Sequence, residues 1–299
     1  MLQRLLQQNL WTNTIGLSRS LLAFGTLSTL LANEAHLLFP SIEDMSNFIM
    51  NSEFSLFYLL KEHLHLAKWV SVIILLMVIS GWKPMLTCIP HWWVAFSFFT
   101  SSPIVDGGDQ ITSILTLLLI PVCITDKRRW HWENNGPKIE SLDFCQQCKH
   151  LFIVSFLIVI KVQIAIIYFH AATAKLSVEE WTNGTALYYW FTHDIFGMGS
   201  FLKPLLIPIL LNPFIVTLMT WSVIVFELLM FAACLMNRRN QKIMLILGIS
   251  FHFSIFVIHG LFSFFFAMTA AILLYLTPAG LNLSTKTSLQ SNKSIILKP

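Results

Sequence analysis

Residues 151–174 read LFIVSFLIVIKVQIAIIYFHAATA, a run in which Lys161 is the only Asp, Glu, Lys or Arg. An α-helix rises about 1.5 Å per residue, so a helix of this length crosses the roughly 30 Å hydrocarbon core of a bilayer. Such a helix satisfies its backbone polar groups internally, which the water-free core demands. The run therefore predicts a membrane-spanning helix and decides the fold class of the chain.

The composition of the whole chain agrees with this run. Of the 299 residues, 56% are hydrophobic and only 11% are charged, and the mean hydropathy is +0.69. Soluble domains carry about 25% charged residues, so this chain cannot cover a soluble surface of its own. The formal net charge of +4 is spread among loops, which does not indicate a nucleic-acid partner. We predict an all-α, polytopic transmembrane helical bundle whose surroundings are the lipid bilayer.

Further apolar runs predict the other spans. We expect eight spans, at 15–31, 57–80, 90–105, 111–124, 151–174, from about Phe214 to 236, and two within 243–276 joined at His259-Gly260. A six-span alternative makes the third a re-entrant or surface segment and drops one other. Pro204, Pro208 and Pro213 predict a broken or interfacial segment before the sixth span. We interpret 1–280 as a single transmembrane domain and 281–299 as a flexible polar tail.

The distribution of positive charge predicts the orientation. If both termini are cytoplasmic, 13 of the 19 Lys and Arg residues fall on the cytoplasmic side, as the positive-inside rule requires. The first apolar run contains Arg19 and lacks a clear cleavage site, so we expect a retained span rather than a signal peptide. The chain is then a multi-pass protein of the cytoplasmic membrane. The segments 106–110, 176–203 and the His259 turn face outward.

The five cysteines indicate no metal centre. Cys145-x-x-Cys148, followed by His150, can bind a metal or form a disulfide, but one CxxC pair without a second is weak evidence. We expect no metal and leave the role of these two cysteines open.

Residues 168–190, YFHAATAKLSVEEWTNGTALYYW, bring charge and aromatic residues to the outer end of the run. Lys175 can be a snorkelling anchor, although positive charge is biased inward. Alternatively, partial desolvation lowers the pKa of a lysine and makes it a base or nucleophile. His170 is offset by about 140° from Lys175 on an ideal helix and reads as a packing residue or a supporting group. Glu179 and Trp181 follow at once.

Three other ionisable residues are candidates on the same side. Asp106 and Asp109 flank two glycines, either as solvated acids of a turn or as a carboxylate pair aimed at Lys175. His252 lies inside an apolar run, where ionisable residues are functional by default or hydrogen-bond a neighbouring helix. Glu227 is the acid expected to pair with His252 or, alternatively, with Lys161.

These residues resemble a known family. YFHAATAKLSVEEWTNG is similar to the catalytic-lysine motif of vitamin K-dependent gamma-carboxylase, and SFHFSIFVIHGLFSFFFAMTA resembles that family's His-bearing helix. The chain thus resembles the horizontally transferred transmembrane (HTTM) family over about 12–277. Its first span, LSRSLLAFGTLSTLL, and GTALYYW resemble the bacterial sporulation-delaying protein B group.

The resemblance implies a function. It implies a membrane enzyme or subunit that matures a secreted peptide toxin from its precursor at the outer face, together with a small A-type partner protein. Lys175 would be the base or nucleophile, His252 and Asp109 would orient it or shuttle protons, and Asp106, His170, Glu179 and Trp181 would support it. Two alternatives remain: a quinone-dependent modification such as carboxylation, and a non-catalytic exporter or immunity protein.

Two departures from the carboxylase pattern matter. The carboxylase has a large extracytoplasmic domain after its spans, whereas this sequence stops soon after the last one, so we expect peptide recognition to come from a separate protein. Where the carboxylase has Asn-Asn-His, this sequence has Gly-Gly-Asp-Gln at 107–110, which puts the use of a quinone in doubt. Lys175 matches the motif, while the family's neighbouring lysine is replaced by Ala174.

Overall fold

The protein is an all-helical bundle in a computed structural model that describes residues 9–39, 52–133, 143–278 and 280, and these contain no β-strand. The predicted tail at 281–299 lies outside the described residues. The long helices are α2 (Asn13–Ala32), α6 (Leu64–Ser80), α7 (Pro84–Ser101), α8 (Gly107–Cys123), α9 (Phe144–Lys175), α13 (Pro213–Ala232), α14 (Arg238–His259) and α15 (Phe262–Leu276). Each predicted span therefore has a helix.

Length and composition make five of the described helical segments long and apolar enough to cross a membrane. They are Asn13–Ala32, Lys61–Ser80, Phe144–Lys175, Pro213–Leu235 and Arg238–His259. Helices α8 and α15 are shorter and apolar. The predicted third span, 90–105, is wrong at both ends, because α7 runs from Pro84 to Ser101. Pro84 occupies the first turn, where proline is favoured, and Pro90 lies inside the helix.

Local sequence signals set the helix ends. Asp143 accepts a hydrogen bond from the backbone N–H of Gln146, and the Gln146 side chain accepts one from the backbone N–H of Asp143. This capping box starts α9. Asn212 caps α13, and the shorter α12 (Lys203–Leu210) precedes it, as the three prolines predicted. Gly260 ends α14 with a φ of +74°, a left-handed conformation that glycine adopts without strain.

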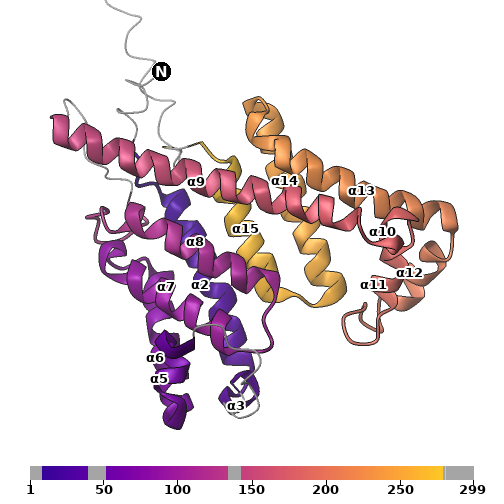
Figure 1. Ribbon diagram of the computed structural model, residues 1–299, viewed down its shortest axis with the longest axis horizontal. Coiled ribbons are helices and arrows are strands. Elements are labelled where there is room, and N and C mark those ends of the chain that lie inside the picture. The colour runs from indigo at the N-terminus through magenta and orange to yellow at the C-terminus, as the bar shows by residue number, and fades with distance from the viewer. Residues whose placement is uncertain (1–8, 40–51, 134–142, 279, 281–299) are drawn as a thin grey trace, which may run out of the picture.

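Helix α15 is the centre of the bundle. Every residue from Ala267 to Leu276 is buried, and the helix packs against α2, α8, α9 and α14. Figure 1 shows α2 and α15 running side by side, with α9 crossing them obliquely toward α13. Large apolar side chains of α9 and α13, such as Ile158 and Leu218, are exposed, as expected of helices that face lipid.

Short helices fill the segment between α9 and α13. They are α10 (Glu179–Thr182), α11 (Ala186–Thr192) and α12, and the side chains of Phe191, Met198, Leu210 and Val216 form a small core among them. Gly184 makes the turn between α10 and α11 with a φ of +84°, and an added Cβ would lie 2.6 Å from Thr217 Cγ2. The turn predicted at this Asn-Gly-Thr is confirmed. Two further short helices, α3 (Ala35–Leu38) and α5 (Leu56–Leu59), pack at the ends of α6 and α7.

Candidate functional site

Lys175, the last residue of α9, forms an ion pair across the gap to α13. Its Nζ lies 2.8 Å from both carboxylate oxygens of Glu227, and it also donates to the Ala171 carbonyl at 3.2 Å. The Lys175 side chain is 21% exposed and that of Glu227 9%. Trp181 of α10 places its ring 5.1 Å from Nζ, in cation–π range. The Lys175 ammonium is therefore half-buried and fixed by an ion pair, unlike the side chain of a snorkelling anchor.

A second polar pair lies deeper on the same face of α9. Tyr168 precedes Lys175 by seven residues, or about two helical turns, so both side chains point toward α13 and α14. The Tyr168 hydroxyl and His252 Nε2 share a hydrogen bond of 2.9 Å, and both residues are almost fully buried. The two pairs thus lie about two turns apart along α9, one joining it to α13 and the other to α14.

His252 lies in an aromatic box. Phe251 and Phe264 meet its ring edge-on with centroids 5.1 and 5.4 Å away, and its Nδ1 has no hydrogen-bond partner among the described residues. The neighbouring-helix hydrogen bond expected for His252 is confirmed, but its partner is Tyr168 rather than Glu227.

Asp106 and Asp109 do not contact Lys175 in this structure. Asp106 caps α8 by accepting from the backbone N–H groups of Gly108 and Asp109, and the Asp109 carboxylate accepts from the Asp106 N–H at 3.1 Å. Ser263, just after the α14–α15 turn, donates to Asp106 at 3.3 Å. The two segments predicted to share a side do lie together, and the carboxylates there act as a helix cap.

The remaining predicted site residues differ in whether they lie beside Lys175. Trp181 contacts Lys175, whereas His170 is exposed on another face of α9 and Glu179 is exposed in the first turn of α10. This agrees with the angular offset expected for His170.

Sequence reasoning missed the main partner of Lys175. It paired Glu227 with Lys161, and that is wrong: the Lys161 ammonium donates to the carbonyls of Leu274, Tyr275 and Thr277 at the end of α15. A usable signal existed, since Glu227 is the only acid in the apolar helix α13 and a membrane-embedded acid needs a partner. Tyr168 carried no signal that separates it from the aromatic belt.

Within the described residues, no group of three or more His, Cys, Asp and Glu side chains is arranged to hold a metal ion. Cys145 and Cys148 are free and exposed in the first turns of α9. One small cavity adjoins Arg19 and another adjoins Lys161, and Lys175 lines neither of these.

The Lys175–Glu227 arrangement can exchange a proton. A lysine and a glutamate in hydrogen-bond contact can exist as an ion pair or, after one proton moves from Nζ to the carboxylate, as a neutral amine and a neutral acid. A low-dielectric surrounding shrinks the preference for the charged pair, because each separate charge is poorly solvated there. The pair thus places a carboxylate, the acceptor that such a transfer needs, directly against Lys175 Nζ.

Comparison with known proteins places this site within a family. Residues 140–279, which contain Lys175, Glu227 and His252, match the HTTM domain. The uncharacterized protein YitO of Bacillus subtilis (strain 168) is 36% identical over 276 residues, which cover 91% of this chain and 87% of YitO. Sporulation-delaying protein SdpB of the same organism is 36% identical over 285 residues, covering 92% of this chain and 84% of SdpB. No solved structure matches. The all-helical apolar bundle and these relatives together show that the chain is a membrane protein that belongs to the HTTM family, in which it is similar to SdpB.

Proposed function

We propose that this protein matures a secreted peptide toxin at the outer face of the cytoplasmic membrane, using Lys175 as the reacting base or nucleophile. The observation that carries the proposal is the Lys175–Glu227 pair, at 2.8 Å and largely buried, inside the segment that matches the HTTM domain. The likeness to a sporulation-delaying protein supports a peptide toxin as the substrate class. A small partner protein presents the precursor in this proposal.

The reaction begins with a proton transfer inside the pair. When the peptide covers the site and excludes water, the Lys175 ammonium gives one proton to Glu227. The resulting amine then reacts with the peptide as the base or nucleophile. Trp181 flanks the ammonium and forms the rim on which a peptide segment can pack. Lys175 is the catalytic residue, and Glu227 is its proton acceptor.

Tyr168 and His252 are positioning residues in this scheme. Their hydrogen bond ties α9 to α14 two turns below Lys175 and fixes the face that α9 presents to Glu227. Asp106 and Asp109 fix the start of α8 beside the α14–α15 turn. Their effect on the reaction is indirect, through the walls of the site.

The proposal is tested by Lys175→Ala in cells that make the precursor. Protein abundance on immunoblots should match the unsubstituted protein, while the mature peptide disappears from the medium. Lys203→Ala is the matched control, because Lys203 is an exposed lysine in the same outer segment. It should leave maturation unchanged. Normal maturation by Lys175→Ala would refute the catalytic role.

A quinone-dependent modification such as carboxylation is the second candidate reaction, favoured by the likeness of the Lys175 segment to the carboxylase motif. It predicts that the peptide gains mass and that membranes must supply a reduced quinone. Cleavage gives shorter fragments and needs no quinone, so the two reactions are separated by one mass spectrum.

A non-catalytic role, as toxin exporter or immunity protein, is favoured by a different observation: the Lys175 ammonium has its hydrogen bonds satisfied, as in a structural ion pair. That role predicts mature peptide in cells that lack the protein, either retained inside or toxic to the producer.

A further inference from the structure

The start of α14 carries a patch of positive charge that has no part in the proposed reaction. Arg238, Arg239 and Lys242 occupy its first turns, and all three are exposed. We call these three residues the α14 patch. It follows the turn between α13 and α14, at the end of the bundle where α15 also ends (Figure 1). The Tyr275 hydroxyl of α15 donates to the Phe231 carbonyl there and fixes the end of α13.

No carboxylate of the described chain neutralises the α14 patch. The sequence from 228 to 299 contains no Asp or Glu, and none of the ion pairs within the described residues includes a cation of the patch. The N-terminal end of a helix carries a partial positive charge, so cations there are disfavoured unless an anion accompanies them. The patch therefore lacks its counter-charge within the described part of the protein.

One guanidinium of the patch is held in place from below. Arg238 Nη1 donates to Gln241 Oε1 at 3.0 Å, and Gln241 Nε2 donates to the Cys234 carbonyl at 3.0 Å. Gln241 is only 8% exposed, so this support is part of the packed bundle. A guanidinium is a planar fork of N–H donors, and the groups that do not contact Gln241 can bind an anion outside the chain.

An exposed apolar strip continues from the patch along α14. Arg239, Lys242, Ile246 and Phe253 are spaced by three, four and seven residues, so they share one face of the helix. The side chains of Ile246 and Phe253 are 63% and 49% exposed. Cations thus stand at the head of an apolar strip on a helix that is long enough to cross a membrane. A phospholipid has the matching arrangement, with an acidic headgroup above its acyl chains.

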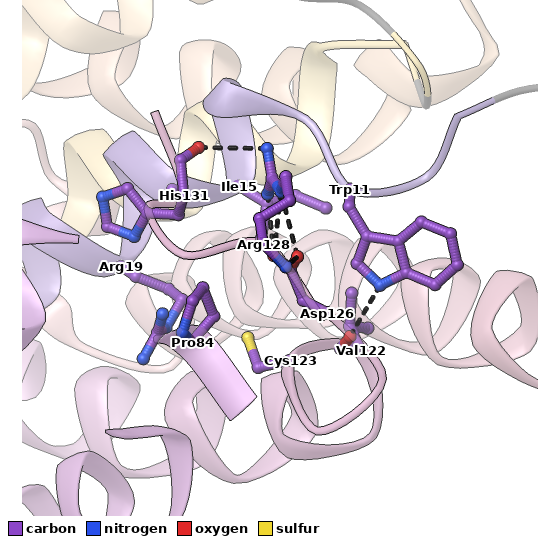
Figure 2. A pocket seen from close by; sticks show the side chains of 10 residues that line it. Trp11, Ile15, Arg19, Pro84, Val122, Cys123, Asp126, Arg128 and His131 are labelled. Atoms are coloured by element: carbon purple, nitrogen blue, oxygen red, sulfur yellow. Dashed lines mark hydrogen bonds and ion pairs between the residues drawn. The ribbon is translucent and has the colours of Figure 1, made fainter. Parts of the chain in front are cut away.

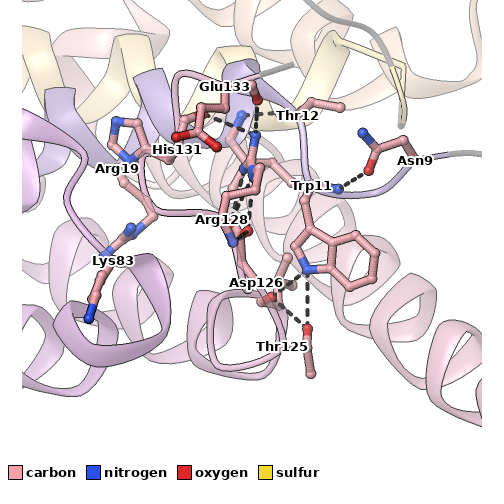
Figure 3. Close-up of polar contacts among 12 residues, drawn as sticks. Asn9, Trp11, Thr12, Arg19, Lys83, Thr125, Asp126, Arg128, His131 and Glu133 are labelled. Atoms are coloured by element: carbon pink, nitrogen blue, oxygen red, sulfur yellow. Dashed lines mark hydrogen bonds and ion pairs between the residues drawn. The ribbon is translucent and has the colours of Figure 1, made fainter. Parts of the chain in front are cut away.

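Two other arginines show what a cation neutralised or enclosed by this chain looks like. Arg128 Nε and Nη2 donate to Asp126 at 2.9 and 2.7 Å, in the network drawn in Figure 3. Arg19 is only 2% exposed, and Figure 2 shows it with His131 on one side of a small cavity. Neither guanidinium can reach a lipid headgroup, whereas the α14 patch is open to one.

We propose that the α14 patch binds the headgroup of one anionic phospholipid, whose acyl chains lie along Ile246 and Phe253. Arg238 and Arg239 bind the phosphate oxygens through paired N–H groups, and Lys242 adds a point charge. A second copy of this chain fits the face less well, because it would bring the same cations against it. The bound lipid supplies the missing counter-charge and stabilises the turn between α13 and α14.

The test is thermal unfolding of the purified full-length protein in a neutral detergent, followed by tryptophan fluorescence. Phosphatidylglycerol is titrated in parallel with phosphatidylcholine of the same acyl chains. Phosphatidylglycerol should raise Tm saturably, by roughly 2–4 °C more than phosphatidylcholine at concentrations well above Kd. Arg239→Gln with Lys242→Gln should lose this difference. Lys127→Gln with Arg129→Gln, which removes two exposed cations from the segment after α8, should keep it.

Three results would overturn the lipid site. They are an equal rise of Tm in the two lipids, a full phosphatidylglycerol response in Arg239→Gln with Lys242→Gln, and an equal rise with inorganic phosphate, which would make the ligand a free anion.

Native mass spectrometry in a mixture of both lipids gives an independent measure. The unsubstituted protein and the Lys127→Gln, Arg129→Gln control should retain one phosphatidylglycerol, and the Arg239→Gln, Lys242→Gln variant should not. A dimer that this variant loses, in place of a lipid, would assign the face to a second copy and overturn the proposal. None of these results bears on Lys175, so the lipid site and the proposed reaction are tested separately.

Discussion

Lys175 and Glu227 stabilise each other only as a pair. Both are largely buried, and removing one partner leaves the other as an uncompensated charge in a poorly solvating environment. Replacing both with apolar side chains of similar volume removes that penalty. A structural ion pair and a reacting pair therefore differ in how function responds when stability is restored.

Glu227→Gln should lower the free energy of unfolding by about 1.5–3 kcal/mol, because the Lys175 ammonium loses its charged acceptor. The double variant Lys175→Met with Glu227→Leu should recover much of this stability and still mature no peptide. Thermal unfolding in detergent and a maturation assay on the same variants measure both effects. Recovery of maturation along with stability would make the pair purely structural.

Tyr168→Phe removes a buried hydroxyl and leaves His252 Nε2 without its partner. The expected loss of stability is about 1–3 kcal/mol. Tyr189→Phe, at an exposed tyrosine of α11, should change stability by less than about 0.5 kcal/mol. Equal unfolding temperatures for the two variants would contradict the hydrogen bond between α9 and α14.

At the scale of the elements, the start of α8 shows how one motif serves the walls of the site. Asp106 and Asp109 satisfy each other's backbone N–H groups in a capping box, and Ser263 ties the cap to α15. Gly108 permits the close approach of α15, since an added Cβ would lie 2.8 Å from the Phe264 Cα. The acids flanking two glycines thus have a structural reason to be there.

Asp106→Ala should cost about 0.5–2 kcal/mol of stability, because the first turn of α8 loses its cap. Asn is an equally good cap without the charge, so Asp106→Asn should retain both stability and peptide maturation. Loss of maturation in Asp106→Asn at normal stability would assign the carboxylate a chemical role instead.

At the scale of the whole molecule, the proposal depends on which side of the membrane each end of the bundle faces. Native cysteines report on this directly, because Cys145, Cys148 and Cys234 are exposed while Cys88 and Cys123 are buried. The predicted orientation places the three exposed thiols on the cytoplasmic side and the α10–α12 segment outside.

A membrane-impermeant maleimide applied to intact cells should therefore leave the native chain unlabelled and label Asp194→Cys, at an exposed position before α12. Permeabilised cells should show labelling of the native cysteines. Labelling of the native chain in intact cells would invert the orientation and place Lys175 on the cytoplasmic side.

The sequence predicted the helices well and the contacts between them poorly. Long apolar runs with caps and prolines define each helix locally, so α9, the break at α12 and the turn at Gly184 were all found. Some helix ends were misplaced. Pro90 was taken as the start of α7, although Pro84 lies in its first turn, and α9 begins at Phe144 and α14 at Arg238, before the predicted starts at 151 and 243. Lys175 and Trp181 were both candidates from the sequence, and they meet in the structure. Lys175 and Glu227 are 52 residues apart in the sequence, and their contact depends on how α9 and α13 cross, which no local pattern encodes.

The most direct test of the reacting lysine is the intact mass of the secreted peptide from three otherwise identical strains: one with the native protein, one with Lys175→Ala at equal abundance, and one lacking the protein. The mass of the mature species should appear only with the native protein, and the Lys175→Ala strain should match the strain that lacks it. The mature mass in the Lys175→Ala strain would contradict the central claim.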